Sequence, residues 1–222
     1  GRVLIGLLDP AALPVDILRP ELMFRSAPDL LAETGIGAFA VGPGLGQSDT
    51  AMALVGTAIG KAQPLVLDAD ALNLVAREPV LQNALAARKN PTLLTPHPAE
   101  AARLLACTTS DIQADRVAAA CRLATRFKAW VVLKGCGSIV AGPDGQWWIN
   151  TSGNPAMATA GMGDVLTGLI TALLARGCPV TVVDNFMYGQ TSLLDCCANE
   201  NLSIVRGDAR DDEGDGDGRA RV

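Results

Sequence analysis

The sequence predicts an α/β fold built on a doubly wound, mostly parallel β-sheet. Short, wholly apolar runs alternate along the chain with segments of helical periodicity, which is typical of strands covered on both faces. Hydrophobic residues make up 49% of the 222 positions and aromatic residues only 4%, so the core must be built from small aliphatic side chains. This composition favours a parallel sheet over a β-sandwich.

The elements follow in chain order. Strands are predicted at 3–8, 38–41, 64–67, 92–95 and 130–133, because each run is brief and apolar throughout. Helices are predicted between them at 50–59, 71–75, 80–87, 99–105 and 111–127, where apolar residues recur with helical spacing. Ser110 is expected to cap the last of these helices. Residues 138–141 and 147–150 flank a Gly/Pro/Asp turn and predict a hairpin on the sheet edge.

Charge and cysteine content exclude several classes of protein. The net charge is −5 and no basic cluster occurs, so the chain lacks the electrostatic footprint of a nucleic-acid-binding protein. Six cysteines without a Cys-x-x-Cys pair, and one histidine, disfavour a zinc site and favour reduced thiols in the cytoplasm. No apolar run has membrane length, and no metal site made by protein residues is expected.

The segment 154–168 is the most informative part of the sequence. Gly161 and Gly163 precede Asp164, and a helical pattern of apolar residues begins directly afterwards. A helix N-terminus with bare backbone N–H groups binds anions, and the glycines allow a phosphate to come close. Asp164 could then act as a base toward a hydroxyl. The alternative is a simple turn with Asp164 as the helix N-cap.

Four further motifs follow the ends of successive predicted strands, where ligands bind in such folds. They are Gly42–Gly46, Asp68 with Asp70, His97 with Glu100, and the Gly-rich segment that starts at Lys134. Asp68 and Asp70 could cap a helix, organise the water around Mg²⁺ or bond backbone N–H groups, and we favour a structural role. His97 could bond structurally or contact a ligand, whereas Glu100 is expected to cap the next helix. Lys134 could reach solvent or nucleotide phosphates.

Taken in this order and spacing, the five motifs resemble the ADP/ATP-dependent NAD(P)H-hydrate dehydratases of the ribokinase-like superfamily. The resemblance extends from Gly1 to about Gly177 and rests on the motifs at 42–46, 68–73, 95–100, 133–137 and 161–164. It implies repair of hydrated NADH and NADPH (NADHX and NADPHX), with ADP or ATP and Mg²⁺ as cofactors. The nucleotide would phosphorylate the hydroxyl of the hydrated ring, and phosphate elimination would restore NAD(P)H. Intact members are expected to be homo-oligomers.

The resemblance also implies roles for individual residues. Asp164 would be the catalytic base, and Gly161, Met162 and Gly163 would form an anion hole for the migrating phosphate. Gly44 and His97 would contact the hydrated dinucleotide together with Asp164. Nucleotide binding would fall to a final group of residues: Lys134, Gly135, Cys136, Gly137, Ser138 and Gly163.

The C-terminal part departs from that family. Members carry a further strand before the start of this chain and further helices after the Asp164 helix, so we expect a domain at 1–177 that is truncated at both ends. Residues 180–195 and 204–211 resemble a strand–helix–strand fragment of NAD-dependent nucleotide-sugar epimerases, in which Asp184 would bond the ribose of NAD. The Gly-rich turn and the Tyr-x-x-x-Lys pair of epimerases are absent from the sequence. We therefore expect a chimera joined near 173–177, with an appended βαβ-like fragment at 178–210 and a disordered acidic tail at 211–222.

Three alternative functions stay open at this stage. A small-molecule kinase of the thiazole or vitamin-precursor type shares the logic of the Gly161–Asp164 motif. A non-catalytic remnant could still bind nucleotide. An epimerase is the least favoured, since its motifs are missing.

Overall fold

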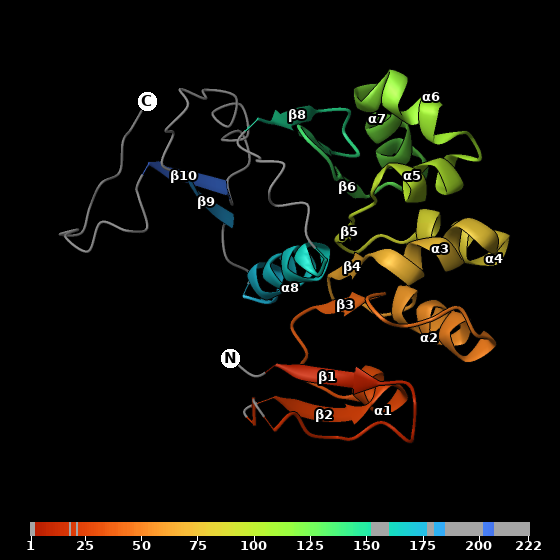
Figure 1. Ribbon diagram of the computed structural model, residues 1–222, viewed down its shortest axis with the longest axis vertical. Coiled ribbons are helices and arrows are strands. Elements are labelled where there is room, and N and C mark those ends of the chain that lie inside the picture. Colours follow the sequence, from red (N-terminus) through yellow and green to blue (C-terminus); the bar gives the residue numbers. More distant parts are fainter. Residues whose placement is uncertain are drawn as a thin grey trace.

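The computed structural model describes residues 3–17, 19–20, 22–151, 160–176, 180–184 and 202–206. Its largest part is a six-stranded sheet in the order β3-β4-β5-β6-β7-β8 (Figure 1). Strands β3 (Phe39–Val41), β4 (Leu65–Leu67), β5 (Thr92–Leu94) and β6 (Trp130–Leu133) pair in parallel. The hairpin of β7 (Ser138–Ala141) and β8 (Trp147–Asn150) continues the sheet in antiparallel fashion. The predicted α/β class with a mostly parallel sheet is confirmed.

Helices cover both faces of this sheet. The strand order rises without reversal, so the helices that connect the parallel strands lie on one face (Figure 1). The helices on that face are α2 (Asp49–Ile59), α3 (Ala69–Arg77), α4 (Pro79–Ala87), α5 (Pro98–Leu105), α6 (Thr109–Ala114) and α7 (Arg116–Phe127). The opposite face carries α8 (Met162–Ala175), which packs on β3 and β4. Among the described residues, the helix that holds the Asp164 motif therefore lies over the β3–β4 end of the sheet, on the face opposite the connecting helices.

The core lies between the sheet and the helices of the first face. Strand β4 is buried along its whole length, and Val55, Leu72 and Leu123 are completely buried against it or its neighbours. Each fully buried aliphatic side chain of this size contributes about 1.5–3 kcal/mol relative to exposure. This packing consequently fixes the positions of the carboxyl ends of β4, β5 and β6.

Arg88 links the end of α2, the loop before β4 and the start of β5 by hydrogen bonds. It follows α4, and its guanidinium donates hydrogen bonds to the carbonyl of Ile59 at 2.6 Å, to Thr92 Oγ1 at 2.9 Å, and to the carbonyls of Lys61 and Gln63. Partial burial lowers the pKa of this guanidinium below its ordinary value. One side chain thus fixes the entrances of both β4 and β5.

The structure differs from the expectations in two places. The first is the single helix predicted at 111–127. Ser110 does not cap a helix at 111–127, because the segment forms two helices with separate caps. The Thr108 hydroxyl accepts from the Asp111 amide at 3.1 Å to start α6, and Asp115 Oδ1 accepts from the Ala118 amide at 2.9 Å to start α7. The apolar periodicity continues through the break, so it conceals the break in the sequence.

The N-terminal strand is the second difference. β1 (Leu4–Leu7) pairs in parallel with β2 (Met23–Ser26), and the two form a sheet separate from the six-stranded one. The sequence reading identified neither β2 nor the short helix α1 (Ala27–Ala32) that follows it. Both are brief, and only Ala27 and Leu31 of α1 are buried, so neither leaves a strong periodic pattern.

Two further short strands lie in the C-terminal part of the chain. β9 (Val180–Asp184) and β10 (Leu202–Arg206) pair in parallel in a two-stranded sheet. The helix expected between them, the tail at 211–222 and the first residues of the 154–168 motif lie outside the described residues. No helix in the part of the chain described here is long and apolar enough to cross a membrane.

Candidate active site

The N-terminus of α8 places the Asp164 motif at the carboxyl ends of the parallel strands. Gly161 is the N-cap and has a positive φ of 86°, and the helix starts at Met162. Asp164 is in the first turn and is therefore not the cap, which removes the simplest structural role for it. Its side chain is exposed, and no hydrogen bond or ion pair of this carboxylate is found among the described residues. The first amides of a helix have no partner within the helix, so this end can receive an anion.

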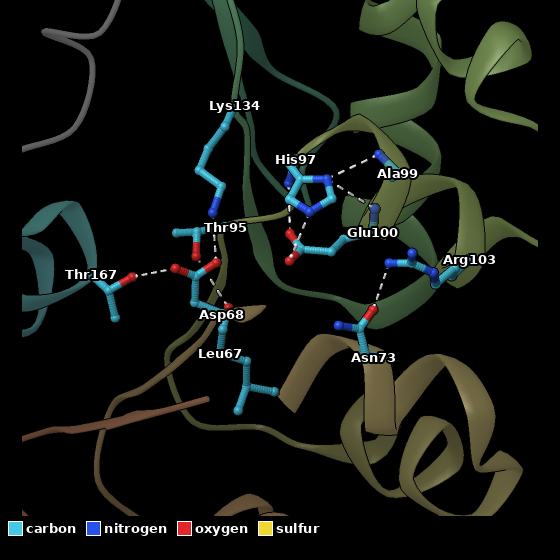
Figure 2. A network of polar contacts seen from close by, with 10 residues as sticks. All are labelled: Leu67, Asp68, Asn73, Thr95, His97, Ala99, Glu100, Arg103, Lys134 and Thr167. Atoms are coloured by element: carbon cyan, nitrogen blue, oxygen red, sulfur yellow. Dashed lines mark hydrogen bonds and ion pairs between the residues drawn. The ribbon is translucent and has the colours of Figure 1, made fainter. Parts of the chain in front are cut away.

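A buried carboxylate connects α8 to two strand ends (Figure 2). Asp68, directly after β4, is 1% exposed. Its Oδ1 accepts from Lys134 Nζ at 2.7 Å, and its Oδ2 accepts from the Thr167 hydroxyl at 2.8 Å. Asp68 stands at the N-cap position of α3 but makes no capping hydrogen bond. It therefore makes neither the helix cap nor the backbone bonds considered from the sequence, because its side-chain partners among the described residues are Lys134 and Thr167.

Lys134 lies against the N-terminus of α8. A Cβ added at Gly163 would be 3.4 Å from Lys134 Nζ and 3.7 Å from Asp68 Oδ2. The ammonium group is thus beside the backbone amides that begin α8. A cation and a helix N-terminus together form a stronger anion site than either one alone.

The Gly42–Gly46 loop packs on the same strand ends. Gly42 has a φ of 136°, and a Cβ at this position would be 1.7 Å from the carbonyl oxygen of Asp68, so only glycine fits. The Gly46 amide donates to Asp70 Oδ2 at 2.8 Å. Asp70 therefore has the structural role that we favoured for it, since it fixes this loop.

His97 and Glu100 form a reciprocal cap at the start of α5 (Figure 2). His97 Nδ1 accepts from the amides of Ala99 at 3.1 Å and Glu100 at 3.3 Å, while the Glu100 carboxylate accepts from the His97 amide at 2.8 Å. The capping role expected for Glu100 is confirmed. His97 has a structural role as well, although its side chain remains 46% exposed.

Arg116 shapes the Gly-rich loop after β6. Its guanidinium donates to the carbonyls of Leu133 at 3.2 Å, Lys134 at 3.3 Å and Cys136 at 2.9 Å. Ser138 adds a hydrogen bond from its hydroxyl to the Gly135 carbonyl at 3.0 Å. These bonds turn carbonyl oxygens toward Arg116 and leave Cys136 exposed. The loop is thereby preformed.

A cavity of about 990 Å³ opens beside Thr167, at the edge of the Asp68 hydrogen-bond network. Its wall includes Gly44 from the loop after β3 and Asp164 and Thr167 from α8. The remaining wall is mainly apolar and comes from β1, α1, β3 and α2, with residues such as Ile5, Leu30 and Leu54. The cavity thus joins the expected base to one of the expected substrate contacts.

The structure brings most of the expected site residues together. Gly161–Gly163, Asp164 and Lys134 lie at one point, and the backbone amide of Lys134 bonds the Pro96 carbonyl at 2.8 Å, which places the His97 segment beside them. The sequence reading missed Thr167 and Arg116. Thr167 is three residues after Asp164, so helical spacing could have revealed it. Arg116 lies in no motif and is defined only by the tertiary fold.

Comparison with known sequence families decides the assignment. The sequence model of the NAD(P)H-hydrate dehydratase family matches residues 2–197. The chain belongs to this family. The match continues past residue 177, and the domain boundary expected there remains a prediction.

Individual relatives agree with the family. The ADP-dependent (S)-NAD(P)H-hydrate dehydratase of Neisseria meningitidis is 48% identical over 187 residues, which cover 81% of this chain and 62% of that protein. The bifunctional NAD(P)H-hydrate repair enzyme Nnr of Moorella thermoacetica is 44% identical over 75% of this chain and 29% of that enzyme. This chain therefore spans less than two thirds of the length of either relative.

A solved structure matches the fold as well. The ADP/ATP-dependent NAD(P)H-hydrate dehydratase of Bacillus subtilis, co-crystallised with ATP and Mg²⁺, superposes with a TM-score of 0.61 at 32% identity. The superposition covers 71% of this chain and 56% of that one. The ribokinase-like architecture expected from the sequence is confirmed.

Proposed function

We propose that this chain dehydrates (S)-NAD(P)H-hydrate to NAD(P)H at the expense of ADP or ATP. The observation that carries the proposal is the meeting of three groups at one edge of the sheet. These groups are the Asp164 carboxylate, the N-terminus of α8 and the Lys134 ammonium, and they lie beside a cavity large enough for part of a dinucleotide. A base, an anion site and a cation are what a phosphoryl transfer to a hydroxyl requires.

The proposed reaction has two steps. Asp164 accepts the proton of the hydroxyl on the hydrated nicotinamide ring while the oxygen attacks the terminal phosphorus of the nucleotide. With ADP, this step breaks the bond to the bridging oxygen and releases AMP. The phosphate then leaves from the ring carbon with the C–O electron pair as a proton is lost from the adjacent carbon, which restores the double bond of NAD(P)H. Phosphate leaves far more readily than hydroxide, so the nucleotide drives the dehydration.

The remaining residues bind and orient. The amides at Gly161, Met162 and Gly163 stabilise the charge on the migrating phosphate, and the Lys134 ammonium beside them shares that charge. The Gly135–Ser138 backbone faces the nucleotide, and Gly44 and the exposed ring of His97 contact the dinucleotide. The mainly apolar wall of the cavity would limit the contact of the bound ring with water.

Mg²⁺ fits this proposal as a companion of the nucleotide phosphates. No group of three or more His, Cys, Asp or Glu residues that could hold a metal ion occurs among the described residues. Asp68 and Asp70 already bind Lys134, Thr167 and Gly46. Mg²⁺ commonly binds through substrate phosphates with few protein ligands, and it would neutralise phosphate charge here. A cytoplasmic location and a homo-oligomeric assembly complete the proposal.

The test is a spectrophotometric assay of the full chain with hydrated NADH and ADP or ATP. Dehydration produces the absorbance of the reduced nicotinamide, whereas a small-molecule kinase would leave a stable phosphoester without that absorbance. Asp164→Asn should lower kcat by about 10²–10⁴-fold, because it removes the base and keeps the size of the side chain. Asp111→Asn is the matched control, since Asp111 occupies the same helical position in α6, away from the cavity. A parental rate for Asp164→Asn would exclude Asp164 as the base.

A further inference from the structure

The side chain of Asp68 makes interactions that its position at the start of α3 does not require. Both of its carboxylate oxygens are engaged, one by the Lys134 ammonium and the other by the Thr167 hydroxyl. The carboxylate is almost completely buried, and the side chain of Lys134 is 21% exposed. A buried ion pair is often no more stabilising than apolar side chains of the same volume. Stability alone therefore does not account for this pair.

The three partners come from separate elements that converge at the phosphoryl site. Asp68 follows β4, Lys134 follows β6, and Thr167 lies one helical turn beyond Asp164 on α8. Asp68 makes no capping bond to α3, although its backbone occupies the N-cap position. Its side chain turns to the site instead.

We propose that Asp68 is a positioning residue for phosphoryl transfer. Its carboxylate holds the Lys134 ammonium beside the first amides of α8, and its bond to Thr167 fixes the rotation of α8 so that Asp164 faces the cavity. Lysine has a flexible stem, and a cation that is placed in advance needs no reorganisation during the reaction. The inference rests on the proposed function, because it assigns Asp68 to the same phosphoryl site.

The first experiment is a double-mutant cycle of Asp68→Asn, Lys134→Met and the two combined. If Asp68 acts through Lys134, Asp68→Asn lowers kcat by about 10–10²-fold in the parent, as expected for a misplaced group. The same change lowers kcat by less than about 3-fold once Lys134 is already Met, since the effects of a coupled pair are not additive. An effect of Asp68 that does not pass through Lys134 would give the same loss in both backgrounds, and that result would overturn the proposal.

The second experiment tests the connection to α8. Thr167→Val should lower kcat by about 10-fold and leave the Kd of ADP, measured by calorimetry, within about 3-fold, because the hydroxyl orients the helix and does not touch the nucleotide. Thr167→Ser restores the hydroxyl and should restore kcat. Thr171→Val is the matched control, since within the described part of the chain its hydroxyl bonds the Thr167 carbonyl one turn back in the same helix and not Asp68. Equal losses from Thr167→Val and Thr171→Val would contradict the role of Thr167.

Two readouts separate this inference from the proposed function. The free energies of unfolding and the Kd of ADP for the four proteins of the cycle are measured without hydrated dinucleotide. An inactive parent that still shows coupling between Asp68 and Lys134 in ADP affinity would refute the dehydratase proposal and support the positioning. An active parent without coupling would do the reverse. Should Asp68→Asn fail to fold, the Thr167 series decides alone.

Discussion

Replacing Gly163 by alanine should separate the stability of the protein from its activity. Gly163 is in the first turn of α8, and alanine is preferred over glycine in helices by about 1 kcal/mol. An added Cβ would be 3.4 Å from Lys134 Nζ and 3.7 Å from Asp68 Oδ2, which are ordinary van der Waals contacts. The fold should accept the methyl group. We expect a gain of about 0.5–1 kcal/mol, or a rise in Tm of about 1–4 °C for a chain of this size.

Activity should change in the opposite direction. The methyl group would be in contact with the ammonium, at the place where an anion must reach both that cation and the amides of α8. A displacement of about 1 Å at a reacting group can cost 10²-fold in rate. We therefore expect kcat/KM to fall by about 10²-fold, which corresponds to about 2.7 kcal/mol at 1.36 kcal/mol for each tenfold. Steady-state kinetics and thermal unfolding of the same preparation measure the two effects.

Gly56→Ala supplies the control for this experiment. Gly56 lies inside α2, where a Cβ would be 3.4 Å from Leu81 Cδ2, a similar distance to that at Gly163. It should raise Tm by a similar amount and leave kcat/KM at the parental value. The reasoning would be refuted if Gly163→Ala kept the parental kcat/KM, because the phosphate would then not approach between Lys134 and the start of α8.

Four further predictions have definite expected outcomes. Arg88→Ala should lower the free energy of unfolding by about 2–4 kcal/mol, since four acceptors lose a charged donor; a loss below about 1 kcal/mol in urea titration would contradict this. Arg116→Gln should weaken ADP binding in calorimetry with little change in Tm, because it releases the carbonyls of the Gly-rich loop; an unchanged Kd would count against a nucleotide role for that loop. Burial, with a nearby carboxylate, raises the pKa of the Cys121 thiol. Near pH 8, iodoacetamide should therefore alkylate Cys121 more slowly than the exposed Cys136, as followed by mass spectrometry. Equal alkylation rates would contradict the burial of Cys121. Deletion of residues 178–222 should leave Tm unchanged or raised, whereas a large drop would show that this stretch is part of the upstream domain.

The parallel sheet was predictable because its signals are local. Strands β4 to β6 are short apolar runs next to helical patterns, and their bounds differ from the expected ones by at most one residue. The start of α8 at the Gly161–Asp164 motif was predictable for the same reason, because the glycines and the acid directly precede an apolar pattern with helical spacing. The caps at Thr108 and Asp115 were missed because continuous apolar spacing hides a break between two helices.

The Asp68 network was beyond sequence reasoning. Asp68 and Asp70 look equivalent in the sequence, and both follow a buried strand. The fold gives Asp70 a backbone amide and Asp68 two side chains, because Lys134 and α8 reach only the inner of the two acids. Such a difference depends on strand order and helix placement, which no local pattern contains.

The Asp68 network also has a consequence for the order in which the protein matures. Its two hydrogen bonds join residues that are 66 and 99 positions apart in the chain. Contacts between distant residues require the closure of long loops and tend to form late in folding. A nascent chain can complete the core around β4 and β5 well before α8 has been synthesised. The proposed anion site needs β4, β6 and α8 together, so we expect it to form late in folding.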